Sequence, residues 1–169
     1  MRVWIAVSAD GFVADSSGGV DWLAAFDSRD FGFDAFIEGI GALIHGRTTY
    51  DQILGFADWP YGPRRTFVLT RRAPPGSPHL GGFDADPSRL LARAREAAGG
   101  KDIWLDGGPG AIAAFLDSGL VDGFEAFVLP VVLGGGVPLF AAGRPRKPRA
   151  IRGENFANGA VRLTYDFAG

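Results

Sequence analysis

A strand, a glycine-rich turn and a helix follow one another between Lys101 and Gly119, and this segment constrains the fold more than any other. Residues 103–105 (Ile-Trp-Leu) form a short apolar run, as a buried strand does. The turn 106–110 (Asp-Gly-Gly-Pro-Gly) places proline where the first turn of a helix tolerates it, and Gly119 suits the helix end. Such a turn presents free backbone N–H groups to an anion. It is also a common connection without a ligand, and it matches neither the P-loop nor the full dinucleotide fingerprint.

A second unit of the same kind begins at residues 42–44, where Ala-Leu-Ile predicts a buried strand. The chain then passes through residues 45–49 into a short helix that ends at Gly55. Asp86 and Pro87 start a further helix, as N-cap and first helical residue. Helices that alternate with strands in this way indicate a mainly parallel sheet.

Other apolar segments complete the predicted sheet. Strands are expected at residues 3–7, 66–69 and 124–129. The dipeptide Asn158-Gly159 predicts a hairpin turn, and apolar and polar residues alternate over 161–167 after it. We therefore expect residues 1–169 to form a single α/β domain with a mostly parallel central sheet, flanking helices and an antiparallel C-terminal hairpin.

Two local predictions concern the segments between these elements. Asp30 is placed to cap a helix whose apolar face would be Phe33, Phe36, Ile37 and Ile40, at spacings of three and four. Residues 73–83 are rich in proline and glycine and predict a loop.

Composition excludes several classes of function. Among 169 residues there is no cysteine and only two histidines, so thiol nucleophiles, disulfides and a multi-histidine metal site are not expected. The formal net charge is −2 without a strongly basic stretch, which argues against nucleic acid or an anionic membrane as a partner. No leader-like segment or membrane span is predicted, so the expected location is the cytoplasm.

Three strand ends carry groups suited to phosphate. They are Gly46-Arg47-Thr48, Leu69-Thr70-Arg71 and Asp106-Gly107-Gly108. In a parallel sheet these ends meet at one edge, where ligands bind. Arginine donates two hydrogen bonds to phosphate through its planar fork. The sequence therefore favours a diphosphate site at this edge.

The ordered set of motifs resembles the dihydrofolate reductase-like fold, and more closely the reductase domain of the bifunctional riboflavin-biosynthesis deaminase-reductase and its stand-alone bacterial relatives. The likeness covers nearly the whole chain. Its motifs are residues 8–14, 46–50, 69–71, 106–109, 120–122 and 130–140.

This resemblance implies NADPH as the cofactor and a homodimer as the assembly. Arg47 and Thr48, after Gly46, would face the adenosine-side phosphates. Thr70 and Arg71, after Leu69, would lie near the 2′-phosphate. The pyrophosphate would lie over Gly107, Gly108, Gly110 and Ala111.

Two carboxylates are the candidate catalytic groups. Asp10 matches the aspartate of the family's Ser-x-Asp-Gly segment beside the nicotinamide and substrate pocket. Asp30 is the nearest counterpart, by its spacing to Gly46, of the carboxylate with which dihydrofolate reductases bind the pterin, and Asp27 is a rival by its distance from Trp22. Each also has a purely structural interpretation, Asp10 as a turn residue and Asp30 as a helix cap.

The chain also departs from the riboflavin enzyme. It lacks the deaminase half, and residues 46–51 (GRTTYD) replace that enzyme's substrate segment. Two functions remain open. The protein is an NADPH-dependent reductase of a small heterocyclic substrate, pterin-like or ribosylaminopyrimidine-like, or it is a nucleotide-binding protein of the same fold without turnover. Trp59 and Tyr61 could form a wall of the substrate site, whereas His45 is expected to be a packing residue.

Overall fold

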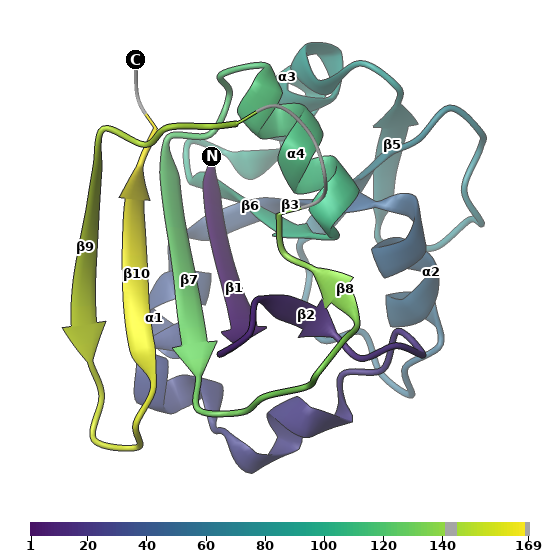
Figure 1. Cartoon of the computed structure of the whole chain (residues 1–169). Coiled ribbons are helices and arrows are strands. Elements are labelled where there is room, and N and C mark those ends of the chain that lie inside the picture. Colours follow the sequence, from purple (N-terminus) through teal and green to yellow (C-terminus); the bar gives the residue numbers. More distant parts are fainter. Residues whose placement is uncertain (141–144, 168–169) are drawn as a thin grey trace.

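The computed structural model describes residues 1–140 and 145–167 and confirms an α/β fold built on one large sheet (Figure 1). The eight strands lie in the order β5-β4-β3-β6-β1-β7-β10-β9. Their bounds are β1 Arg2–Ser8, β3 Ile40–Gly46, β4 Arg65–Leu69, β5 Leu80–Asp84, β6 Asp102–Gly107, β7 Gly123–Leu129, β9 Ala150–Asn155 and β10 Val161–Asp166. Neighbours from β5 to β7 pair in parallel, and β10 is antiparallel to both β7 and β9. The predicted parallel sheet and C-terminal hairpin are both present.

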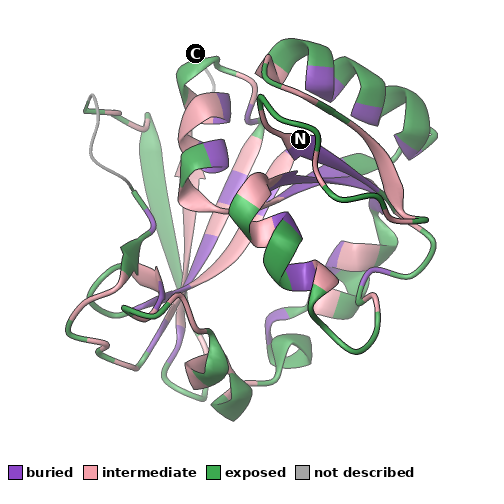
Figure 2. Cartoon of the chain, turned by 90° about the vertical axis from the view of Figure 1, so that its right-hand side faces the viewer, coloured by how far each residue is buried: buried purple, intermediate pink, exposed green. Residues whose placement is uncertain are grey.

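Helices cover both faces of the sheet. Their bounds are α1 Phe33–Glu38, α2 Arg47–Leu54, α3 Pro87–Ala98 and α4 Pro109–Asp117, with the 3₁₀ turns η1 Asp21–Ala25 and η2 Ser28–Phe31. Helices α3 and α4 pack on one apolar cluster with Ile44 of β3, whereas α1 and α2 pack on another with Leu43. Adjacent residues of a strand point to opposite faces, so β3 supplies both clusters and is buried between them (Figure 2). Among the described residues, no helix is long and apolar enough to cross a bilayer.

Several boundaries follow from local chemistry that the sequence announces. The carboxylate of Asp86 accepts hydrogen bonds from the N–H groups of Ser88 at 2.8 Å and Arg89 at 3.0 Å, and α3 starts at Pro87 as predicted. Gly55 follows the last residue of α2. Gly159 has φ +83° in the turn between β9 and β10, a conformation that glycine adopts without strain.

The segment around Asp30 differs from its prediction. Asp30 lies within η2 and does not cap a helix. Gly32, in the left-handed region at φ +81°, separates η2 from α1. Helix α1 ends at Glu38, and Ile40 belongs to the buried strand β3, with 1% of its surface exposed. The apolar spacing of three and four therefore continued by chance across a helix end.

The predicted loop 73–83 was also wrong at its end, because β5 begins at Leu80. The strand contains two glycines, which lower strand propensity. A Cβ at Gly81 would lie 2.6 Å from the ring of Phe67. Glycine at this position is what lets β5 pair closely with β4.

A small second sheet lies beyond the carboxyl end of β1. It pairs β2 (Phe12–Ala14) with β8 (Val137–Pro138) in antiparallel fashion. At Gly136 a Cβ would lie only 2.1 Å from the carbonyl oxygen of Ala14. This close approach holds the loop after β7 against the turn after β1 and closes one side of the cleft described next.

Candidate active site

A cleft of about 890 Å³ opens at the carboxyl ends of β1, β3, β4 and β6. Its lining is mostly apolar and includes Trp4, Ile5, Ala6, Val13, Val20, Leu23, Ile53, Phe56, Leu69 and Trp104. Polar lining comes from Arg47, Thr48, Thr49, Gln52, Tyr61 and Asp106. An apolar cleft with a few convergent polar groups at this edge of a parallel sheet is the expected form of a small-molecule site.

Two helix starts meet at the cleft. Strands β3 and β6 are neighbours, and their ends lead into α2 at Gly46 and into α4 at Gly108. Neither helix start has a side-chain cap. At α4, Pro109 has no N–H and the N–H of Ala111 donates to the carbonyl of Gly108 at 2.9 Å, so the N–H of Gly110 is the one left for a ligand. The peptide bond between Gly107 and Gly108 is cis. A Cβ at Gly108 would lie 3.1 Å from Oγ1 of Thr49, so glycine lets the two helix starts pack closely.

The predicted cofactor residues divide between the cleft and its border. The cleft lining includes Gly46, Arg47, Thr48, Leu69, Gly108, Gly110 and Ala111. Gly107, the last residue of β6, directly precedes Gly108. Thr70 and Arg71 line a separate depression with Arg72, directly after Leu69 in the chain.

The two candidate phosphate-binding arginines differ in their surroundings. Nε of Arg47 donates to both carboxylate oxygens of Asp51, at 2.8 and 2.9 Å, and its Nη1 donates to the carbonyl of Ala73 at 3.3 Å. Within the described part of the chain, the exposed side chain of Arg71 has no hydrogen bond or ion pair. Arg71 is therefore the freer of the two cations.

Asp10 and Asp30, the predicted catalytic carboxylates, lie outside the lining that the described residues form. Asp10 accepts hydrogen bonds from the N–H groups of Leu133 at 3.1 Å and Gly134 at 2.7 Å, and from Oγ of Ser8 at 2.7 Å. The hydrogen bond from Ser8 in particular lowers the pKa of Asp10. Its carboxylate thus fastens the turn after β1 to the loop after β7.

Asp30 and its rival Asp27 both lie at the exposed turn η2. Asp27 caps this turn by accepting from the N–H of Arg29, and it also pairs with the guanidinium of Arg29. This pairing lowers the pKa of Asp27 to about 2.

The carboxylate that does line the cleft is Asp106, at the end of β6, which was not among the predicted catalytic residues. Its Oδ2 accepts the hydroxyl proton of Tyr61 at 2.5 Å, and Nδ1 of His45 lies 3.4 Å from the same oxygen. Only 16% of the Asp106 side chain is exposed. Burial raises its pKa to about 6, although the hydrogen bond from Tyr61 acts in the opposite direction.

His45 and Tyr61 enclose this carboxyl from two other segments. Burial lowers the pKa of His45 to about 3, so its imidazole is neutral near pH 7 and gives Asp106 no positive charge. Burial, together with the neighbouring Asp106, raises the pKa of Tyr61 and keeps its phenol protonated. A carboxyl that titrates near neutrality beside an apolar cleft can hold or release a proton there. Among the described residues there is no group of three side chains suited to a metal ion.

The fold and the cleft define a dihydrofolate reductase-like α/β protein. Dihydrofolate reductase from Enterococcus faecalis, complexed with NADP(H) and RAB-propyl, matches with a TM-score of 0.65 at 16% identity, over 98% of this chain and 94% of that chain. The diaminohydroxyphosphoribosylaminopyrimidine deaminase/5-amino-6-(5-phosphoribosylamino)uracil reductase from Thermotoga maritima matches with a TM-score of 0.70 at 17% identity, over 99% of this chain and 56% of that chain. Both neighbours are named as reductases.

The family follows from sequence. The model of the RibD C-terminal domain matches residues 63–162, and the chain belongs to this family. The uncharacterized protein YwjB of Bacillus subtilis (strain 168) is 31% identical over 171 residues, which cover 96% of this chain and 95% of the relative. The resemblance inferred from the ordered motifs is therefore confirmed.

Proposed function

We propose that this protein is an NADPH-dependent reductase of a small heterocyclic substrate, pterin-like or ribosylaminopyrimidine-like. The observation that carries the proposal is the convergence of two uncapped helix starts on one apolar cleft, with the exposed Arg71 in a separate depression two residues after the cleft-lining Leu69. Family membership and the fold shared with a reductase that binds NADP(H) support it.

The cleft suits the dinucleotide in shape and in chemistry. A Cβ at Gly110 would meet nothing within 4 Å, so this glycine leaves open a space that a side chain would occupy beside the start of α4. The backbone N–H of Gly110 is suited to the pyrophosphate, which would lie over Gly107, Gly108 and Ala111. Arg47 and Thr48 are suited to phosphate oxygens, and Thr70 and Arg71 to the 2′-phosphate. NADPH supplies the hydride when it is bound.

Asp106 is the group that we propose for the proton step. Its protonated carboxyl would donate to a substrate atom next to the carbon that receives the hydride, and Tyr61 would orient it. We prefer Asp106 to Asp10 and Asp30 because the hydrogen bonds of Asp10 serve the loop after β7, and Asp30 lies on the exposed turn η2. The surrounding apolar side chains would exclude water from the reacting atoms.

The test is a titration with NADPH and NADH, followed through the fluorescence of Trp4 and Trp104, which both line the cleft. Arg71→Ala should weaken NADPH binding about tenfold or more and leave NADH nearly unchanged, since a charged hydrogen bond contributes about 1.5–3 kcal/mol. Arg65→Ala, at the opposite end of β4, is the matched control and should change neither. Failure of both cofactors to bind at millimolar concentration would refute the proposal. NADPH binding without oxidation of NADPH by any pterin or pyrimidine would instead indicate a binding protein.

The predicted homodimer also remains a proposal. Exposed apolar side chains occur at Val132, Val137 and Phe140 after β7, and at Ile151 of the edge strand β9. Exposed apolar side chains, and an unpaired strand edge such as that of β9, both favour self-association. Sedimentation velocity should give the mass of a dimer, and a monomer at high concentration would contradict this assembly.

A further inference from the structure

Apart from the first residues of α2 and α4, the lining of the cleft carries very little charge. It includes Trp4, Leu23, Phe56 and Trp104, and its polar groups are Gln52, Tyr61 and Asp106. Among the described residues, Asp106 is the only carboxylate in the whole lining and Arg47 is the only cation. The small number of charged lining residues restricts which substrates the cleft can bind.

Arg47 does not supply positive charge to the rest of the lining. It is the first residue of α2, and its guanidinium is paired with Asp51 and bonded to the backbone at Ala73, before β5. His45, whose Nδ1 lies 3.4 Å from Oδ2 of Asp106, is neutral near pH 7 because burial lowers its pKa to about 3. A phosphate or carboxylate group of a substrate would therefore find, among the described lining residues, no cation other than the paired Arg47 assigned to the cofactor, and it would approach Asp106, a group that itself ionises.

The free energy needed to bring such an anion next to Asp106 is large compared with ordinary differences in binding free energy. An anion that leaves water for an apolar site without a counter-charge loses its hydration without compensation. A flat, uncharged ring has no such cost and gains contact with Trp4, Phe56 and Trp104. Tyr61 donates to Oδ2 of Asp106, and no described residue donates to Oδ1. One polar edge of a ring can therefore be satisfied at Oδ1.

The volume of the cleft also favours a substrate without a long tail. Pockets of roughly 300–1,000 Å³ hold one drug-sized ligand. This cleft, of about 890 Å³, includes the helix starts assigned above to the cofactor. The remaining volume suits a ring system better than a ring with a long tail.

We propose, on the basis of the reductase function above, that the substrate is a planar uncharged heterocycle without a phosphate or carboxylate tail, and that its polar edge lies on Asp106 and Tyr61. The enzyme would thus discriminate against the phosphoribosylated and glutamylated forms of the same rings.

Two matched pairs of compounds test this substrate class. One pair is 7,8-dihydropterin and 7,8-dihydrofolate, which differ by a tail that ends in carboxylates. The other is 5-amino-6-ribosylaminouracil and its 5′-phosphate. Calorimetric titration of the NADP⁺-saturated protein should show the uncharged member of at least one pair binding about tenfold or more tightly than the charged member. Equal or tighter binding of the charged members would overturn the proposal.

The two proposals fail in different ways. If the protein binds NADP⁺ but none of the four compounds, the substrate class is rejected and the cofactor function stands. If NADP⁺ itself does not bind, the reductase function fails first.

A gain-of-charge variant gives an independent measurement. Val20 lines the cleft and is 40% exposed, so it tolerates a longer side chain. Val20→Arg should increase affinity for the 5′-phosphate about tenfold, whereas the neutral control Val20→Gln should not. An unchanged affinity in Val20→Arg, with the fold intact by circular dichroism, would mean that charge in the cleft does not govern selection and would contradict the proposal.

Discussion

Two carboxylates of this molecule are buried to nearly the same extent but have opposite surroundings. Glu125 of β7 is 13% exposed and Asp106 of β6 is 16% exposed. Arg2 donates to Glu125 at 2.5 Å and Arg162 at 3.3 Å. Asp106 instead receives one phenol hydrogen bond and faces a neutral imidazole. At equal burial, the negative charge of Glu125 is thus compensated by two arginines, whereas that of Asp106 has no cation beside it.

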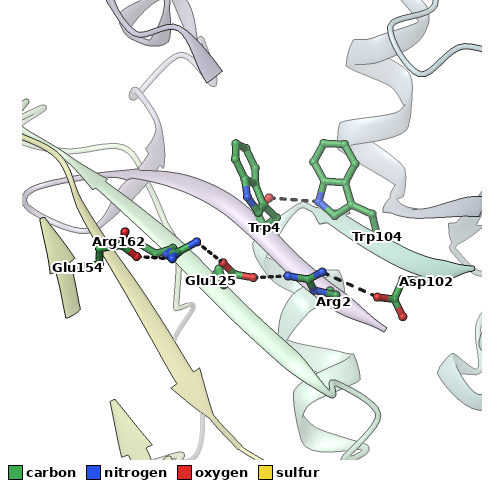
Figure 3. A network of polar contacts seen from close by, with 7 residues as sticks. All are labelled: Arg2, Trp4, Asp102, Trp104, Glu125, Glu154 and Arg162. Atoms are coloured by element: carbon green, nitrogen blue, oxygen red, sulfur yellow. Dashed lines mark hydrogen bonds and ion pairs between the residues drawn. The ribbon is translucent and has the colours of Figure 1, made fainter. Parts of the chain in front are cut away.

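The compensated carboxylate belongs to a row of charges that crosses five strands (Figure 3). The row runs from Asp102 through Arg2, Glu125 and Arg162 to Glu154. The guanidinium of Arg2 also lies 5.2 Å from the ring centroid of Phe36. Such a row ties neighbouring strands together, and nothing in it requires a ligand. The uncompensated Asp106 gains nothing for the fold by ionising, which is typical of a group kept for chemistry.

The comparison is tested most severely by Asp106→Asn, which keeps the shape of the side chain and an acceptor for Tyr61 but removes the transferable proton. We expect the rate of NADPH oxidation with the best heterocyclic substrate to fall about 10²–10⁴-fold, the usual contribution of a general acid. Asp102→Asn, the same change at the other end of β6, should leave the rate unchanged. Retention of the rate in Asp106→Asn, with NADPH binding normal, would remove Asp106 from the proton step.

The sequence predicted the fold much better than the chemistry of the site. Apolar runs, glycine stops and the Asp86 cap are local signals, and they located most strands and helices. Strand β5 was missed because its two glycines carry no strand signal, and their role becomes visible only against Phe67.

The acid–phenol–imidazole cluster could not be predicted for a related reason. His45, Tyr61 and Asp106 come from β3, a loop and β6, and only the fold brings them together. The available signal was a carboxylate at the last positions of an apolar strand, within the Asp-Gly-Gly turn. That turn was interpreted as a phosphate site, and its first residue was not considered as an acid. Asp10 stands in an equally suggestive position, yet its partners, Leu133 and Gly134, are distant in sequence.

The dependence of stability on pH should distinguish the two carboxylates next. The pKa of Asp106 is raised from 3.8 to about 6, so the folded state holds this proton more firmly than the unfolded state. Asp106 therefore favours folding at low pH, and this contribution is lost as pH rises from about 4 through 6. One pKa unit corresponds to about 1.4 kcal/mol. The unfolding free energy of Asp106→Asn, relative to the natural chain, should accordingly increase by about 2–2.5 kcal/mol between pH 4 and pH 7.

Urea denaturation at several pH values measures this difference. His45 acts in the opposite direction in the same window, because its lowered pKa costs stability as pH falls below 6.5. Both chains contain His45, so its effect cancels in the difference between them. A difference that stays constant from pH 4 to pH 7 would contradict the raised pKa of Asp106.

The smallest expected effect concerns the compensated carboxylate. Glu125→Gln makes the same chemical change, from carboxylate to amide, but it leaves Arg2 and Arg162 without their shared anion. We expect a loss of about 1–2 kcal/mol in unfolding free energy at pH 7, because both arginines are about one-third exposed and water screens part of the interaction. The loss should shrink at high salt, and NADPH binding should not change.

Glu154→Gln is the matched control for this variant, because Glu154 lies at the end of the same row with a side chain that is 53% exposed. Its loss should be below about 0.5 kcal/mol. The change from carboxylate to amide should therefore alter the unfolding free energy in opposite directions at two equally buried positions. At pH 7, Asp106→Asn should increase it and Glu125→Gln should decrease it. Equal signs would mean that burial alone, and not the presence of cations, determines what a carboxylate costs this sheet.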